Sequence, residues 1–204
     1  MRFMRRLIDV IFATLWLIIT APLFILIAIL IRLDSTESIF YSPRMVGKDG
    51  KEFLLLRFRT MSTDISGRGN EQRFTRVGRI IRNYSLDHLP MLINLLKGDL
   101  TIVGPRPMEI HVVNLLDSRW QQYFQSKPGV FNYAVLKLGK FWTPARVSNP
   151  TRNQELELEY YQKRSPVVDL QLFLRFLYKF VRSTGNVKAR GTPDPDEENR
   201  LHNS

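Results

Sequence analysis

The sequence predicts an α+β protein, mostly helical, in which a small mixed domain lies between two helices of apolar character. Residues 10–31 are apolar, uncharged and interrupted by a proline, residues 38–103 mix short strand-like runs with helical patterns, and residues 167–182 repeat like an amphipathic helix. We therefore expect a membrane anchor over 1–33, a globular domain over 34–185 and a disordered tail over 186–204.

Composition excludes several kinds of chemistry before any motif is considered. The 204 residues include no cysteine and three histidines, so a disulfide framework, a thiolate metal site, a cysteine nucleophile and a histidine-rich zinc site are not expected. The formal net charge is +11, and residues 34–185 carry +9 of it. A basic domain implies anionic partners, and nucleic acid, acidic lipid headgroups and phosphorylated small molecules all qualify at this point.

The strongest single signal is the apolar run from Val10 to Ile31, which has 22 residues and no charge. A helix of that length can cross a bilayer, at about 1.5 Å per residue. A cleaved signal peptide is the first alternative, but the run is too long and no small-residue cleavage site follows it. The segment is therefore predicted to anchor the chain to a membrane.

Pro22 lies near the middle of this run and bears on how the run meets the membrane. Proline removes the hydrogen bond to the Ile18 carbonyl, so we expect a kink there, with Thr20 partly satisfying that carbonyl. Arginines flank the run on both sides, three before it and Arg32 after it, and positive charge favours the cytoplasmic face. A bent helix that enters the membrane and returns satisfies both observations. A straight spanning helix with an ordinary proline kink is the alternative.

Strand signals follow the anchor. Residues 38–41 and 52–61 have strand-like patterns, and the Asp49-Gly50 hairpin signal precedes the second run. Alternation along the second run places Leu54, Leu56 and Phe58 on one face and Phe53, Leu55, Arg57 and Arg59 on the other. Two guanidinium groups then share a face, which is either a functional surface or an exposed edge that carries charge.

Helical patterns and helix breakers organise the rest of the domain. Loops are expected over 62–73 and 126–152. Helices are expected over 75–83, over 87–97 up to Gly98, over 108–125 with a stripe of Val112, Leu116, Trp120, Tyr123 and Phe124, and over 167–182 after Ser165-Pro166, with a strand over 100–103. The last helix suits either a membrane interface, with lysine and arginine at the headgroups, or a buried core.

Asp87 stands at the start of the predicted helix that ends at Gly98. Pro90 lacks a backbone N–H and is tolerated only in the first helical turn, which places Asp87 at or beside the N-cap. Capping alone explains an aspartate there. A carboxylate at the positive end of a helix is also a competent anionic nucleophile or Mg²⁺ ligand, so both interpretations stay open.

Arg106 lies between Pro105 and Pro107, directly after Gly104. The two prolines fix their own φ, so little backbone freedom is lost when the guanidinium engages an oxyanion, and its fork matches phosphate. The alternative is a rigid turn between a strand and a helix.

Three segments resemble a known family in their order and spacing. They are Arg57–Met61 (RFRTM), Ser85–Pro90 (SLDHLP) and Asn94–Pro107 (NLLKGDLTIVGPRP). From about residue 3 to residue 185 the chain is similar to the bacterial sugar transferases, the monotopic polyprenyl-phosphate phosphoglycosyl transferases that start exopolysaccharide, O-antigen and glycoprotein glycans. The resemblance includes the apolar segment with its central proline.

The resemblance implies a two-step transfer assisted by Mg²⁺. An aspartate attacks the sugar-bearing phosphate of a UDP-sugar, UMP leaves, and the phosphosugar passes to a polyprenyl phosphate. By position, Asp87 matches the nucleophile and a metal ligand, Arg106 the proline-flanked arginine, and Arg44, Arg59 and Arg82 basic positions near phosphate. The resemblance also implies a re-entrant anchor bent around Pro22, contact with membrane lipid, and location at the bacterial inner membrane with the domain on the cytoplasmic face.

The chain departs from the family pattern at two places that bear on catalysis. His88 stands where the family has Glu after the nucleophile, which removes a hard oxygen ligand, so His88 either transfers protons or packs at the helix start. In the segment 127–135, Asn132-Tyr133 and Val135 replace the usual Gly-Trp and Gln. Near the bend, Ala21 replaces the usual Ser before Pro22.

Three hypotheses follow. The first is an active phosphoglycosyl transferase, because Asp87, Arg106 and the anchor are retained. The second is a non-catalytic membrane relative that acts as a scaffold or regulator, which is motivated by His88. The third, a membrane-tethered nucleic-acid binder, has only charge and aromatic content in its favour, and no recognition motif supports it, so nucleic acid is not expected as a partner. The sequence identifies neither the sugar, nor the glycan pathway, nor the oligomeric state.

Overall fold

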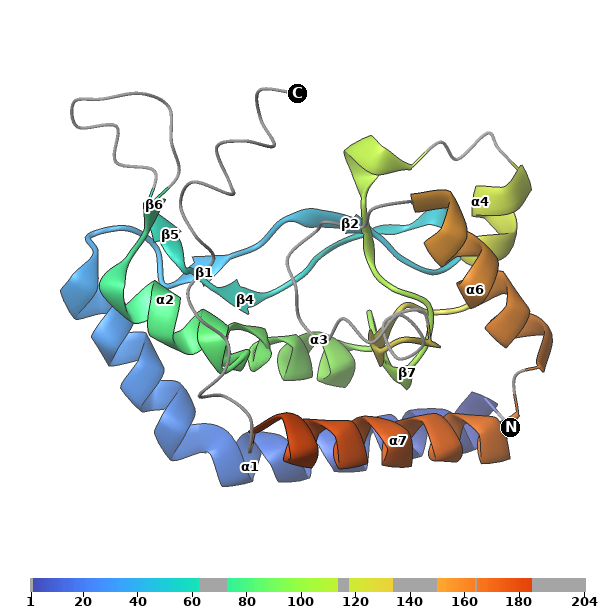
Figure 1. The fold of residues 1–204 in the computed structure, drawn as a ribbon, viewed down its shortest axis with the longest axis horizontal. Coiled ribbons are helices and arrows are strands. Elements are labelled where there is room, and N and C mark those ends of the chain that lie inside the picture. Colours follow the sequence, from blue (N-terminus) through green and yellow to red (C-terminus); the bar gives the residue numbers. More distant parts are fainter. Residues whose placement is uncertain (1, 63–72, 114–117, 134–149, 164, 185–204) are drawn as a thin grey trace. The chain divides into compact units, whose positions relative to one another are not determined.

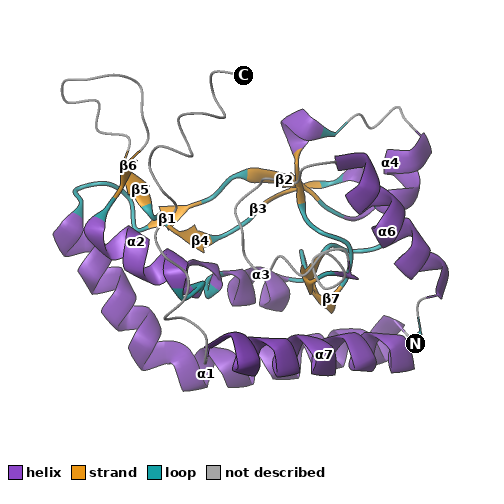
Figure 2. Ribbon diagram, in the orientation of Figure 1, coloured by secondary structure: helices purple, strands orange, loops and turns teal. Residues whose placement is uncertain are grey.

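The computed structural model describes residues 2–62, 73–113, 118–133, 150–163 and 165–184 (Figure 1). The chain divides into two compact units, Met1–Arg164 and Ser165–Ser204. Helices and short strands alternate along the first unit (Figure 2). The predicted loop over 62–73 and the predicted tail over 186–204 lie mostly or wholly outside the described residues.

The apolar run forms most of α1 (Arg2–Asp34), which continues without interruption through Pro22. The helix changes direction near its middle, so the proline bends it and does not break it (Figure 1). Thr20 was expected to satisfy the Ile18 carbonyl, but its hydroxyl donates to the Trp16 carbonyl at 2.7 Å. A hydroxyl that bonds back to the preceding turn in this way favours a bend in the helix.

Short antiparallel strands follow α1. β1 (Phe40–Tyr41) pairs with β4 (Arg57–Phe58), and β2 (Arg44–Val46) pairs with β3 (Glu52–Leu54). The β2–β3 hairpin turns through Lys48–Gly50, where Asp49 and Gly50 have φ of 57° and 77°. The hairpin predicted from Asp49-Gly50 is therefore confirmed, because these two residue types tolerate positive φ.

The single strand predicted over 52–61 is wrong. The segment divides into β3, β4 and β5 (Met61–Ser62), and the last pairs with β6 (Arg73–Phe74). Between β3 and β4 the side chain of the buried Asn94 takes the place of a strand partner. Its amide donates to the Leu54 carbonyl at 2.7 Å and accepts from the Leu56 N–H at 2.8 Å. The alternation fails across this break, because Leu54 and Phe58 were predicted on the same face but are 54% and 2% exposed.

Two helices and a tight turn carry the central part of the unit. α2 (Arg76–Asn83) begins after Thr75, whose hydroxyl accepts from the Gly78 N–H at 2.9 Å, as expected for a helix over 75–83. The next helix, α3 (Met91–Lys97), ends at Gly98 with φ of 90°. It begins at Met91 and not at Asp87, because Leu86–His88 form a separate 3-10 turn.

The predicted strand over 100–103 is confirmed as β7 (Thr101–Val103), which pairs in parallel with β9 (Gly129–Phe131). The helix predicted over 108–125 is wrong. Its first residues form β8 (Met108–Glu109), since they pair with β2 through Met45 and Val46. Of the other described residues in this range, Ile110–Val112 form a 3-10 turn and Ser118–Tyr123 form the short helix α4. α6 (Pro150–Lys163) is a helix that the sequence patterns did not predict.

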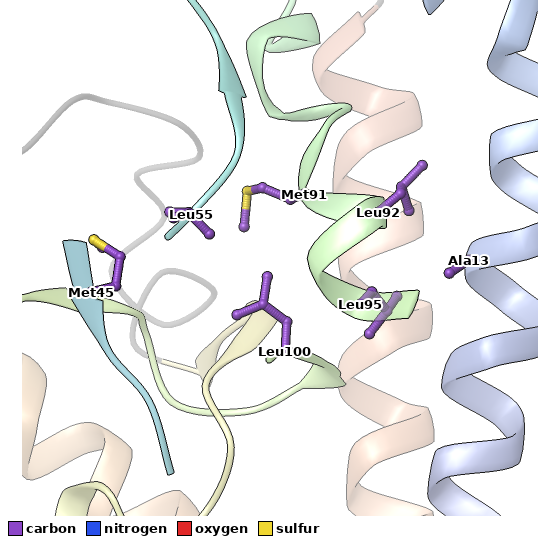
Figure 3. Packing of buried hydrophobic residues seen from close by; sticks show 7 residues of the cluster. All are labelled: Ala13, Met45, Leu55, Met91, Leu92, Leu95 and Leu100. Carbon is purple, nitrogen blue, oxygen red and sulfur yellow. The ribbon is translucent and has the colours of Figure 1, made fainter. Parts of the chain in front are cut away.

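Both halves of α1 contribute to the core of the first unit. Its amino-terminal half packs on α3 through a cluster that contains Ala13, Met45, Leu55, Met91, Leu92, Leu95 and Leu100 (Figure 3). Its carboxyl-terminal half contributes Ile27 and Ile31 to a second cluster with Phe58 and Ile81. The other face of α1 exposes large apolar side chains, and Met4–Asp34 is long and apolar enough to cross a membrane.

The second unit contains α7 (Pro166–Thr184), in agreement with the helix predicted over 167–182. Ser165 caps it, because its hydroxyl accepts from the Val168 N–H at 3.2 Å. Exposed apolar side chains recur along one side of this helix at helical spacing: Val167, Leu170, Leu174 and Tyr178.

Candidate active site

Asp87 lies in the 3-10 turn Leu86–His88, between α2 and α3. The turn begins at Ser85, which has a φ of 57°, and the N-cap position of α3 is held by Pro90. Capping of α3 therefore does not account for Asp87. The residue is only 6% exposed, and its Oδ1 has no hydrogen-bond partner among the described residues. A buried carboxylate oxygen without a partner is costly, which points to a ligand or a reacting group.

His88 holds the other oxygen of the same carboxylate. Its Nδ1 lies 2.9 Å from Asp87 Oδ2. Burial lowers the pKa of His88 below its usual value, against the opposing effect of the hydrogen bond with Asp87, and the guanidinium of Arg57 lowers it further. Because this pKa is lowered, the imidazole is neutral near pH 7, and its Nδ1 faces the carboxylate of Asp87.

Arg57 brings positive charge to this carboxylate from β4. Its Nε is buried and has no hydrogen-bond partner within the described part of the chain. Burial lowers the pKa of Arg57, while the charge of Asp87 raises it; Arg106 and Arg82 also lower it, and Glu109 raises it. Each of these charges acts on the pKa of Arg57, so three arginines and two carboxylates belong to the same site.

Arg82 reaches the site from the last turn of α2. Its guanidinium lies over the ring of Phe74, 4.6 Å from the ring centroid, and one nitrogen is 3.8 Å from the Met61 sulfur. Its charge is among those that lower the pKa of His88. The ring contact helps to hold the Arg82 side chain in place.

The loop that carries Arg106 is fixed by hydrogen bonds from two other segments. Gly104 N–H donates to the Phe131 carbonyl at 3.0 Å, Gly129 N–H donates to the Pro105 carbonyl at 2.8 Å, and the Tyr123 hydroxyl donates to the Arg106 carbonyl at 2.9 Å. The backbones of the two glycines touch, since a Cβ added to Gly129 would lie 2.0 Å from Gly104 N. The loop is therefore a rigid turn, and that turn also presents Arg106 to the site.

Arg59 and Arg44, the other two predicted phosphate positions, have partners elsewhere. Arg59 forms an ion pair of 2.5 Å with Glu37 and donates through Nε to the Ser38 carbonyl at 2.8 Å. The Arg44 side chain is 75% exposed and lies 4.0 Å from Glu52. The residues that the structure brings together are thus Asp87, His88, Arg57, Arg82 and Arg106, joined by Glu109.

Arg57 and Glu109 are the site residues that the sequence reasoning did not assign. The signal for Arg57 was available, because it shares the RFRTM segment and a predicted face with Arg59. Glu109 had no such signal, since it was placed in a helix and its strand pairing with Met45 depends on the fold.

The altered segment 127–135 lies next to the Arg106 loop, because β9 pairs with β7 and bonds to Gly104. Asn132 is buried, and the ring of Tyr133 stacks on Tyr160 of α6, 5.7 Å between centroids. Val135 lies outside the described residues.

The arrangement suits binding and attack on an anionic phosphorus centre. One carboxylate oxygen is held by a neutral imidazole and the other is unpartnered, and three guanidinium groups supply the positive charge that such a centre requires. Within the described residues, no three of His, Cys, Asp and Glu form a metal-binding group. A metal ion held by Asp87 would therefore complete its shell with water and substrate oxygens.

Comparison with known proteins shows which family the chain belongs to. Residues 1–183 match the family model for bacterial sugar transferases. The chain is 31% identical to the uncharacterised sugar transferase EpsL of Bacillus subtilis, over 89% of each chain. It is 33% identical to the UDP-glucose:undecaprenyl-phosphate glucose-1-phosphate transferase of Caulobacter vibrioides, over 84% of this chain and 67% of that protein. It is 35% identical to the exopolysaccharide production protein ExoY of Sinorhizobium fredii, over 62% of this chain and 65% of that protein.

Proposed function

Since the chain belongs to the bacterial sugar transferase family, we propose that it transfers a sugar 1-phosphate from a UDP-sugar to undecaprenyl phosphate and releases UMP. Relatives of this chain are named for that reaction with glucose and with N-acetylgalactosamine as the sugar. The proposed reaction is the first membrane step in the synthesis of a surface polysaccharide or glycoconjugate.

The observation that carries the proposal is the unpartnered oxygen of Asp87 in a site that also contains Arg57, Arg82 and Arg106. In the first step Asp87 Oδ1 attacks the phosphorus that bears the sugar. The new O–P bond replaces the bond from that phosphorus to the bridging oxygen, and UMP leaves with the electron pair. Arg57, Arg82 and Arg106 stabilise the charge that spreads over the phosphate oxygens as the bonds exchange.

In the second step a phosphate oxygen of undecaprenyl phosphate attacks the same phosphorus. The bond to Asp87 breaks, the carboxylate is restored, and the product is undecaprenyl-diphospho-sugar. His88 Nδ1 lies beside Oδ2, so Oδ1 is the oxygen that faces the phosphorus in both steps.

Mg²⁺ fits this site through Asp87 alone. Magnesium commonly binds one or two carboxylates and takes the rest of its ligands from water and substrate phosphates. The Asp87 carboxylate would hold it through the oxygen that does not attack, together with the donor diphosphate. The ion would supply further positive charge where two anions approach each other.

We propose that α1 is a re-entrant anchor at the bacterial inner membrane, with the domain on the cytoplasmic face. Support comes from α1 itself, because Arg6 near one end and Asp34 at the other both hydrogen-bond to the same unit while the face between them is apolar and exposed. The exposed apolar side of α7 suits an interfacial helix in contact with lipid. Labelling of single cysteines placed at positions 2 and 36 tests the topology. The sequence contains no cysteine of its own, so only the introduced residue reacts with the label. Access to both from the cytoplasm is expected, and one on each side of the membrane overturns the re-entrant proposal.

The second candidate function is a non-catalytic relative that binds the same ligands as a scaffold or regulator. The specific observation in its favour is His88, which replaces an oxygen ligand beside Asp87 with an imidazole that burial keeps neutral. Turnover of any UDP-sugar above background removes this candidate.

The test is UMP release from a panel of UDP-sugars by the full chain in membranes, with Mg²⁺ and undecaprenyl phosphate. Asp87→Asn is expected to abolish release. The matched control Asp49→Asn makes the same chemical change at a carboxylate that is 58% exposed in the β2–β3 turn, and it is expected to keep full activity. A donor labelled in the sugar, supplied without the lipid acceptor, should label the protein but not the Asp87→Asn variant. No release from any donor by folded, membrane-bound protein overturns the proposal.

A further inference from the structure

Arg6, Asp9 and Asp34 of α1 make hydrogen bonds to elements of the first unit that lie far along the chain. Near the start of the helix, the Arg6 guanidinium donates to the Leu95 carbonyl at 2.6 Å and to the Leu96 carbonyl. These are carbonyls in the last turn of α3, which a helix leaves without partners of its own. Arg6 therefore caps the carboxyl end of α3 and places a positive charge at the negative end of its dipole.

Asp9, one turn further along α1, binds β7. Its Oδ1 accepts from the Ile102 N–H at 2.9 Å, and its Oδ2 accepts from the Thr101 hydroxyl at 3.0 Å. The carboxylate is 6% exposed, and it is the one acidic group in residues 1–33. Membrane insertion gives no reason for a carboxylate in an apolar helix, whereas a bond to the β7 backbone does.

Asp34 makes the third contact at the far end of α1. Its Oδ2 accepts from the Val77 N–H at 2.9 Å, in the first turn of α2. This N–H belongs to a helix terminus and has no partner within α2, so Asp34 and the Thr75 hydroxyl together cap that helix.

Each of the three contacts meets an element that carries part of the candidate site. α3 directly follows the turn with Asp87 and His88. β7 leads into the loop with Arg106, and Arg82 lies in the last turn of α2. The polar groups of α1 thus reach all three of these elements, although none of them reaches a reacting atom.

We propose that Arg6, Asp9 and Asp34 are positioning residues for the transfer reaction, and that α1 is part of the framework of the active site as well as its anchor. The proposal rests on the function proposed above. One helix, α1, thus bonds to α3, β7 and α2, the elements that position Asp87, Arg106 and Arg82. These three elements therefore keep their spacing while α1 lies in lipid. Small displacements of such groups reduce the rate strongly, because attack requires the reacting atoms to be aligned.

Asp9 offers the sharpest test, because two substitutions there separate position from charge. Asp9→Leu removes both acceptors and leaves the Ile102 N–H and the Thr101 hydroxyl unpaired. Asp9→Asn keeps an oxygen for the Ile102 N–H, and its amide can donate to the Thr101 hydroxyl. Thr14→Leu is the matched control, since it makes the same helix more apolar at an exposed position and removes no contact to β7.

Four forms of the full chain in membranes are compared: parent, Asp9→Leu, Asp9→Asn and Thr14→Leu. We expect Asp9→Leu to lower kcat for UMP release about 10-fold or more while KM for the UDP-sugar changes less than about 2-fold and membrane partition is unchanged. Asp9→Asn and Thr14→Leu should keep kcat within about 2-fold of the parent. Amide hydrogen exchange over residues 101–106 should be faster in Asp9→Leu alone.

The outcomes separate this inference from the proposed function. If the parent releases UMP and Asp9→Leu matches Thr14→Leu in kcat and in exchange, the positioning role is overturned and the function stands. If Asp9→Leu raises KM and leaves kcat unchanged, the role is also overturned, because Asp9 then affects only binding. If the parent releases no UMP, the proposed function fails, and amide hydrogen exchange alone tests the structural role of Asp9. Equal exchange rates in all four forms overturn the link between α1 and the Arg106 loop. Faster exchange in Asp9→Leu supports that link.

Discussion

His88 Nδ1 lies 2.9 Å from Asp87 Oδ2, so two consecutive residues of one turn form an imidazole–carboxylate pair. Asp87 is buried and the His88 side chain is 18% exposed, and the neighbouring positive charges of Arg57 and Arg82 oppose protonation of the imidazole. His88 is therefore a neutral neighbour of the carboxylate. A glutamate at position 88 would instead place a second carboxylate beside Asp87 and add negative charge and an oxygen ligand.

Protonation of His88 is expected to make stability depend on pH. Its pKa is lowered in the folded protein, so below about pH 6.5 the unfolded chain binds a proton that the folded chain does not. Stability is then full above that pH and falls as the pH decreases toward the lowered pKa. Tm should decrease between pH 7 and pH 5.5 in the parent and decrease less in His88→Gln. His111→Gln, at a side chain that is 71% exposed, should follow the parent, and identical curves for all three proteins contradict the prediction.

Arg57 is expected to contribute to turnover more than any exposed arginine of the same unit. Its buried guanidinium has an unpartnered Nε and lies among the charges of the Asp87 site. Arg57→Gln should lower kcat for UMP release by about 10²-fold, as the loss of one preorganised charge does at other phosphoryl and oxyanion sites. Arg79→Gln removes an exposed arginine from α2 and should leave kcat unchanged. Equal effects of the two substitutions would show that Arg57 acts only through net charge.

Local signals account for the elements that the sequence predicted correctly. Thr75 and Ser165 cap helices with bonds to residues three positions ahead, and Gly98 ends α3 with positive φ. Asp49-Gly50 turns a hairpin within a few residues. Each of these features is decided by neighbours along the chain, so composition and spacing contain the information.

Distant partners account for the failures. The break between β3 and β4 depends on Asn94, 38 residues beyond Leu56. β8 replaces a helix because its residues pair with β2. Arg57 lies near Asp87, whereas Arg59 forms an ion pair with Glu37. Alternation along a strand does not predict which acidic residue each arginine meets.

Asn94 is expected to be essential for stability, because it joins α3 to the two strand ends. It is 1% exposed and bonds to the Leu54 carbonyl, the Leu56 N–H and the Asp99 carboxylate. Asn94→Asp loses the amide donor and places a second negative charge 3.0 Å from Asp99 Oδ2, at an expected cost of about 3–5 kcal/mol of unfolding free energy. Asn83→Asp makes the same change at an exposed position in α2 and should cost less than about 1 kcal/mol. Denaturant unfolding of both variants in detergent measures the difference, and similar midpoints would contradict the structural role.

Gly129→Ala is expected to damage the Arg106 loop through the backbone. A Cβ at this position would lie 2.0 Å from Gly104 N and 2.8 Å from the Val103 carbonyl carbon, so β7 and β9 would have to separate. The Gly129 N–H bond to the Pro105 carbonyl and the Gly104 N–H bond to the Phe131 carbonyl both span this contact and would lengthen with it. We expect a loss of at least about 1–3 kcal/mol of unfolding free energy together with a lower kcat, since the same movement displaces Arg106. Gly50→Ala meets no such clash, and its cost of about 1 kcal/mol comes from the φ of 77° alone, with no effect on kcat. A Gly129→Ala protein with parental kcat would show that the β7–β9 contact does not position Arg106.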